Sequence, residues 1–130
     1  MDTPNCSAAR RIGQAAAAFE KRRTGHLPQS LTVVLSEKTL VITLHGMLSP
    51  AETALAKSPA GSVEVQDYHR QLFANASDSL RQEIRRITGA EVTGATLEIE
   101  TTSGTMVQVC LLAHCVPVDT WSGSQPFDQS

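Results

Sequence analysis

The sequence lacks long hydrophobic runs and has few cysteines. Its longest apolar stretches have the length of a β-strand, far below the roughly 20 residues that a helix needs to cross a bilayer. The N-terminal residues carry charges in place of the apolar segment of a secretory signal. Three cysteines, an odd number, argue against a disulfide framework and are typical of a reducing compartment. We therefore expect a soluble, cytoplasmic protein without a membrane-spanning segment.

The chain also lacks the basic excess of a dedicated nucleic-acid-binding protein. Eleven Lys and Arg residues stand against thirteen Asp and Glu residues, a formal net charge of −2 at pH 7. The Gly-x-x-Gly loop of a KH-type RNA module is absent as well. The charge is uneven, since residues 1–25 carry +3 and the remaining 105 residues carry −5. That basic first segment is rich in Ala, which inserts weakly into membrane surfaces, so we expect it to pack on the domain itself. No nucleic-acid partner is expected.

The most informative stretch is residues 40–52, where the hydrophobic period changes from that of a strand to that of a helix. Alternation of apolar residues over positions 40–45 predicts a strand. Ser49 then stands at an N-cap position, Pro50 at the first helical position, and Glu52 where the second partner of a capping box lies. The pattern predicts a strand that leads directly into a helix, with Ser49 as a structural cap.

Similar changes of period give the order of the other elements. They predict a helix that ends near residues 25–28, a hairpin over 31–45, a short helix over 49–57, a long helix over 58–88 and a second hairpin over 97–112. The long helix would extend about 45 Å. Its apolar residues span an arc of about 160°, which is wide for contact with one surface. Residues 1–116 are predicted to form one domain, and the polar residues 117–130 a flexible C-terminal tail.

The order helix, hairpin, short helix, long helix, hairpin predicts an α+β fold. Its simplest form is a two-layer sandwich, in which helices cover one face of a four-stranded, mostly antiparallel sheet. The strands carry apolar residues in both phases, so one layer of helices would leave a set such as Val34, Val41, Cys110 and Leu112 against water. Exposed apolar patches usually mark interfaces, and a twofold contact is the commonest solution, so we expect a homodimer.

An alternative is that the chain covers this surface itself. The first helix, or the tail through Trp121 and Phe127, would then lie over the apolar residues. In that case the protein would be a monomer.

Two short motifs resemble a known family. The first is Gly46-x-Leu48-Ser49-Pro50-Ala51-Glu52-x-x-Leu55-Ala56-Lys57 with Gly61 beyond it, and the second is Ile87-Thr88-Gly89-x-x-Val92. Together they resemble the MpsC-like domain, described as a component of a Na⁺-translocating, membrane-potential-generating system and otherwise a domain of unknown function. The resemblance covers roughly residues 8–113. It departs at Leu27, where related sequences have the second Gly of a Gly-x-Gly-Pro turn. It implies a protein partner in a membrane ion system, to which this chain would be an accessory, and it provides no catalytic residue.

No group of residues forms a recognised catalytic or ligand-binding motif. Cys110, His114 and Cys115 come nearest to a metal or redox site, because thiolate and imidazole are zinc ligands, yet their spacing is unusual and no second cluster accompanies them. Glu98 and Glu100 share one strand face, whereas catalytic carboxylate pairs lie on different elements of a cleft. We expect no enzyme activity, metal or cofactor, and a protein-interaction domain. The alternative is a small-molecule or metal-binding module that uses the Cys110/His114/Cys115 region.

Overall fold

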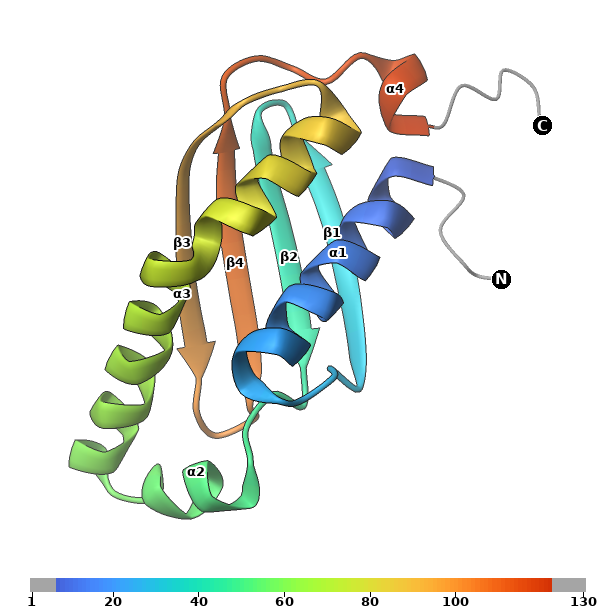
Figure 1. The fold of residues 1–130 in the computed structure, drawn as a ribbon. Helices are drawn as coiled ribbons and strands as arrows, with labels where there is room; N and C mark the ends of the chain where they lie inside the picture. Colours follow the sequence, from blue (N-terminus) through green and yellow to red (C-terminus); the bar gives the residue numbers. More distant parts are fainter. Residues whose placement is uncertain (1–6, 123–130) are drawn as a thin grey trace.

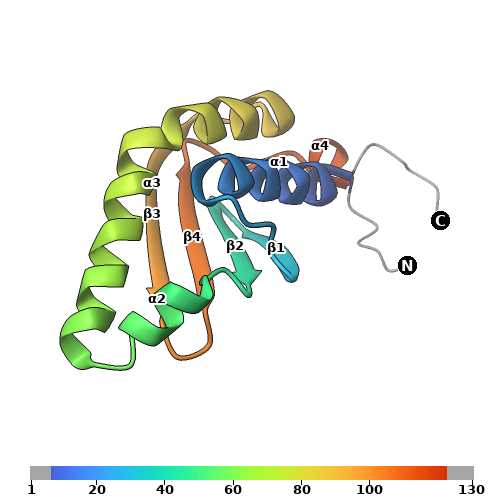
Figure 2. The same cartoon turned by 60° about the horizontal axis from the view of Figure 1, so that its bottom comes forward.

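The predicted α+β fold is confirmed in a computed structural model, which describes residues 7–122. The strands form one antiparallel sheet in the order β1-β2-β4-β3. Helices α1 and α3 lie over one face of this sheet, and α2 lies at one end of the helix layer (Figures 1 and 2). The elements are α1 (Ser7–Thr24), β1 (Ser30–Ser36), β2 (Thr39–His45), α2 (Pro50–Leu55), α3 (Pro59–Thr88), β3 (Val92–Glu100), β4 (Thr105–Leu112) and α4 (Val118–Ser122).

The core lies between the two central strands and the helix layer. The inward residues of β2, namely Leu40, Ile42 and Leu44, are fully buried, as is Met106 of β4. Alternate positions of β2 are only half-buried, which is the period of a strand with one covered face. The alternation that predicted this strand from the sequence therefore also identifies its buried side.

The uncovered side of the sheet, here called the open face, differs in part from the prediction. Val34 and Val41 lie on it as expected, but Cys110 and Leu112 of β4 are buried beneath the helices. The reason is the strand register: Val41 lies opposite Val109, and directly opposed residues share a face. The exposed apolar residues of β4 are therefore its odd-numbered ones. The open face carries Thr32, Val34, Val41, Thr43, Thr96, Val107, Val109 and Leu111, together with the exposed carboxylates Glu98 and Glu100 at its β3 side.

The path of helix α3 explains the wide arc of its apolar residues. The helix bends near its middle, so its two halves meet different neighbours (Figures 1 and 2). The first half follows the outer edge of β3, where the Gln66 side chain donates to the carbonyl of Ile99 at 3.4 Å. At the bend, Phe73 meets Phe19 of α1 edge-on, with ring centroids 5.9 Å apart. The second half packs against α1 through residues such as Leu80, so the two halves bury most of the arc, while Tyr68 remains 55% exposed.

The predicted tail begins with ordered structure. Helix α4 contacts α1, and Trp121 is partly buried against the core. Figure 1 shows α4 beside the start of α1, away from the open face. Phe127 and the rest of residues 123–130 lie outside the described residues.

The structure explains why two positions of the family motifs are glycines. A Cβ atom on Gly61 would lie only 1.9 Å from the carbonyl oxygen of Leu55, because the first turn of α3 lies against the end of α2. Gly89 ends α3 with a φ of 78°, the left-handed conformation typical of a helix C-cap. Both residues shape the chain rather than contact a ligand.

We predict that Gly61→Ala lowers the free energy of unfolding by about 1–3 kcal/mol, because a methyl group must displace backbone. Urea denaturation measures the loss. Gly94→Ala is the matched control, since its Cβ would meet only Leu111 Cδ1 at 3.7 Å, an ordinary contact. Equal effects of the two substitutions would contradict the steric explanation.

Candidate functional site

The predicted cap at the start of α2 is present and has an additional partner. The Glu52 backbone N–H donates to Ser49 Oγ at 3.1 Å, and the Ser49 N–H donates to Glu52 Oε1 at 3.0 Å, which completes a capping box. The second carboxylate oxygen of Glu52 lies 2.7 Å from Nε2 of His69 in α3. Burial alone would raise the pKa of Glu52, but its bonds to Ser49 and His69 together hold the pKa below its ordinary value. The cap therefore also joins α2 to α3.

His69 is a buried, neutral histidine. It is 1% exposed, and burial lowers its pKa more than the neighbouring Glu52 carboxylate raises it, with Arg23 lowering the pKa further. Because an ionised carboxylate only accepts hydrogen bonds, we assign the ring proton to Nε2, which donates to Glu52. The other ring nitrogen, Nδ1, is buried without a hydrogen-bond partner. His69 thus acts as a link between helices.

A second buried polar group joins α1 to the sheet. Glu20 is 0% exposed and forms an ion pair with Arg23, one turn further along α1. Its other oxygen accepts a 2.6 Å hydrogen bond from Nε2 of Gln108 in β4. Burial raises the pKa of Glu20, although Arg23 and Gln108 act in the opposite direction. Arg23 Nη1 also donates to the backbone carbonyl of His69 at 3.5 Å, so α1, α3 and β4 meet at this group.

The sequence contains a signal for these buried polar residues. Gln108 stands between Met106 and Cys110 on the inward phase of β4, and His69 falls between Val65 and Phe73 on the buried stripe of α3. A polar residue in an apolar stripe needs a partner. The identity of that partner is not available from the sequence, because Gln108 and Glu20 are 88 positions apart.

A pocket of about 320 Å³ lies where α1, α2 and α3 meet. Its lining includes Arg23, His26, Glu52, Tyr68 and His69. The charged members are already paired inside the protein, Arg23 with Glu20 and Glu52 with His69. The charged side chains that line this pocket therefore serve the structure, and none of those in the described chain is left unpaired to face a ligand.

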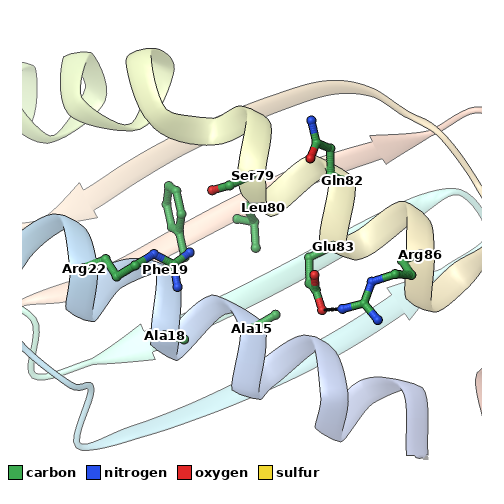
Figure 3. A pocket seen from close by; sticks show the side chains of 9 residues that line it. All are labelled: Ala15, Ala18, Phe19, Arg22, Ser79, Leu80, Gln82, Glu83 and Arg86. Carbon is green, nitrogen blue, oxygen red and sulfur yellow. Dashed lines mark hydrogen bonds and ion pairs between the residues drawn. The ribbon is translucent and has the colours of Figure 1, made fainter.

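A larger hollow of about 500 Å³ lies between α1 and the second half of α3. Figure 3 shows Phe19 and Leu80 at its sides and an ion pair between Glu83 and Arg86 on α3. Arg22 of α1 lies beside Phe19, at the other end of the hollow from this pair (Figure 3). The polar side chains here are surface groups, and their arrangement contains no nucleophile paired with a base.

The region proposed as the alternative metal site is divided by burial. Cys110 faces the core, where burial raises the pKa of its thiol to about 11 despite the opposing charge of Arg81. Cys115 and His114 are exposed beyond the end of β4, and His114 Nδ1 contacts the Cys115 carbonyl at 3.0 Å. Within residues 7–122, no three potential metal ligands converge.

The carboxylates of β3 have separate structural roles. Glu98 forms an exposed ion pair with Arg70 of α3 at 2.7 Å. Glu100 accepts hydrogen bonds from Thr102 and Ser103 in the β3–β4 turn, which lower its pKa to about 2. These two side chains therefore stabilise the turn and the α3–β3 contact.

The open face is the side of the sheet that no helix covers within residues 7–122. Val34 is 56% exposed and Leu111 49% exposed, while Val41, Val107 and Val109 are half-buried. Exposed apolar side chains that gather on one face often mark an interaction site. The candidate functional site is therefore an interaction surface on the sheet.

The fold is that of a two-layer α+β domain. A family model described as "Na+-translocating membrane potential-generating system (MpsC)" matches residues 6–114, and the chain belongs to this family. No curated protein and no solved structure matches the chain. A search of the described helices for a segment able to cross a membrane finds none.

We predict that Ser49→Ala lowers the free energy of unfolding by about 1 kcal/mol, because the N–H of Glu52 loses its capping partner. Chemical denaturation tests the value. Ser79→Ala, at an exposed position within α3, should change the stability by less than about 0.5 kcal/mol. An unchanged Ser49→Ala variant would show that the cap does not stabilise the domain.

We predict that acid weakens the fold through His69. Its pKa is lowered in the folded state, so the unfolded state takes up the proton more readily, and stability falls as the pH drops below about 6.5. The lowered pKa of Glu52 acts in the same direction below about pH 4.5. His69→Gln, which keeps a donor for Glu52, should flatten the change between pH 7 and 5, measured by urea denaturation. The control His114→Gln should keep the wild-type slope, and an unflattened slope in His69→Gln would contradict the assignment.

Proposed function

We propose that this protein is a non-catalytic, cytoplasmic protein-interaction domain that works as a homodimer. Its process is the one for which the family is described, a Na⁺-translocating, membrane-potential-generating system, in which it serves as an accessory. The observation that carries the proposal is the open face, an apolar sheet surface without a covering element in the described chain.

The character of the open face supports a protein partner. Its residues are mainly Val and Thr, whose short branched side chains form a flat surface with little conformational entropy to lose. No charged residue lies on the open-face positions of the two central strands, β2 and β4. A surface of this kind fits another folded surface better than a small polar molecule.

The pairing of the polar groups supports a role without catalysis. The carboxylates of Glu20 and Glu52 each have partners that fix them in place, and His69 bonds Glu52. A general base needs access to a substrate proton, which the fully buried Glu20 does not have, and both oxygens of the partly exposed Glu52 are already hydrogen-bonded. These groups hold the helices against one another and against the sheet.

The basic first helix supports contact through protein rather than through lipid. Three of its basic residues, Lys21, Arg22 and Arg23, stand in its last turn, where positive charge is favourable beside the helix C-terminus. Arg23 is buried in the ion pair with Glu20 and is unavailable to lipid headgroups. The formal charge of α1, counted from its sequence, is therefore larger than the positive charge at its surface.

The test is co-sedimentation with membrane vesicles from cells that express the whole Na⁺ system, compared with vesicles made from the same lipids without protein. We expect binding only to the former, and several-fold weaker binding for Leu111→Ser on the open face. Leu27→Ser is the matched control, because Leu27 is an exposed leucine in the loop after α1.

Two results would overturn the proposal. Equal binding to protein-free vesicles that disappears at high salt would indicate electrostatic attraction to lipid headgroups. Binding to the protein-containing vesicles that is insensitive to Leu111→Ser would move the contact away from the open face.

A further inference from the structure

The two edges of the sheet are treated differently. The outer edge of β3 is guarded by α3, whose Gln66 reaches the Ile99 carbonyl and whose Ser62 hydroxyl lies 2.6 Å from that of Thr101. Strand β1 forms the other edge, and within residues 7–122 its only strand neighbour is β2. Edge strands in monomeric proteins are usually blunted by charge, proline or a bulge. The seven residues Ser30–Ser36 have no charge and no proline, and their register with β2 is unbroken.

The core side of β1 is also incompletely covered. Leu31, Val33 and Leu35 are only half-buried, although they share a face with the fully buried residues of β2. Beside Leu31 and Val33 lies a groove of about 430 Å³ between β1 and α1, lined on the helix side by Gly13 and Ala17 and by the polar side chains of Arg10 and Gln14. The side chains of an added strand would project into this groove and complete the cover.

The sequence of β1 is close to symmetric about Val33. It reads Ser-Leu-Thr-Val-Val-Leu-Ser, so the residues at equal distance from the centre are Ser with Ser, Leu with Leu, and Thr with Val. An antiparallel copy centred on Val33 would therefore place Leu31 opposite Leu35 on the core side. It would place Thr32 opposite Val34 on the open face, and no like charges would meet.

The hydrogen-bonding pattern of the β1 backbone fits this pairing. The loop between β1 and β2 has two residues, Glu37 and Lys38, and closes on the pair Ser36–Thr39. That closing pair is hydrogen-bonded in a hairpin of this type, and bonded pairs alternate with non-bonded ones. Counting back, Val33 falls at a non-bonded position. Its N–H and C=O groups point away from β2, as a central pair in a second ladder requires.

We propose that a second copy of this chain adds to the free edge of β1 in an antiparallel manner, across a twofold axis at Val33. The result is a continuous eight-stranded sheet with two helix layers on the same side. This inference rests on the proposed homodimer and assigns its surface to the β1 edge. The open faces of both copies then join into one surface that stays available to a heterologous partner.

Charged substitutions at the open-face positions of β1 test the pairing. Thr32 and Val34 are both exposed, so substituting them leaves the core intact. In Thr32→Lys/Val34→Lys, two like-charged pairs face each other across the axis, and in Thr32→Glu/Val34→Lys two opposite pairs do. Leu111→Lys, in a central strand, is the control that alters the open face and not the edge.

Sedimentation equilibrium at micromolar concentration gives the outcome. We expect a dimer for the wild type, an increase of about tenfold or more in the dimer Kd for the Lys/Lys variant, and near wild-type dimers for the Glu/Lys and Leu111→Lys variants.

The failures of the two proposals are distinguishable. A monomeric wild type removes the homodimer and this pairing together, as would be seen if the chain's own ends covered the edge. A dimer that persists in the Lys/Lys variant keeps the homodimer and overturns the β1 pairing. Loss of the dimer in the Leu111→Lys variant, or in both double variants, assigns the dimer contact to the open face instead.

Discussion

The arrangement of the whole domain depends on the bent helix α3, which performs two tasks with one element. Its first half guards the edge of β3, and its second half packs against α1 over the sheet. A helix occupied in this way on one side of the molecule does not reach the other edge or the other face, and no other helix of residues 7–122 covers that face. The free edge of β1 and the open face are therefore direct consequences of how α3 is used.

The polar interior serves the same construction. Taking Glu20 out of water is costly, and its ion pair with Arg23 and its bond from Gln108 offset that cost only while all three are in position. Glu52 and His69 form a second polar pair of this kind, between α2 and α3, in which the carboxylate is less buried. Both groups favour one arrangement of the helices on the sheet, because another arrangement would separate Glu20 from Gln108, or Glu52 from His69. Their chemistry is therefore directed inward.

The parts of the fold that the sequence predicts are those fixed by local chemistry. The box of Ser49 and Glu52, and the ending of α3 at Gly89, depend on neighbours within a few positions. The face on which Cys110 lies depends instead on its pairing with Leu40, 70 positions away, and a shift of one residue reverses every side chain of the strand. The partners of Gln108 and His69 are non-local in the same sense. The bend of α3, which is set by packing, has no proline to announce it.

The motifs that resemble the family and the surface proposed to act are different parts of the molecule. Ser49, Glu52, Gly61 and Gly89 form caps and a close backbone approach, so they specify the fold of the MpsC family. The open face and the β1 edge lie on strands outside these motifs and need only β-branched, uncharged residues. Such a requirement is met by many sequences and leaves no short signature. Recognition of the family by its motifs therefore identifies the scaffold, whereas the proposed contacts depend on the shape and charge of the sheet.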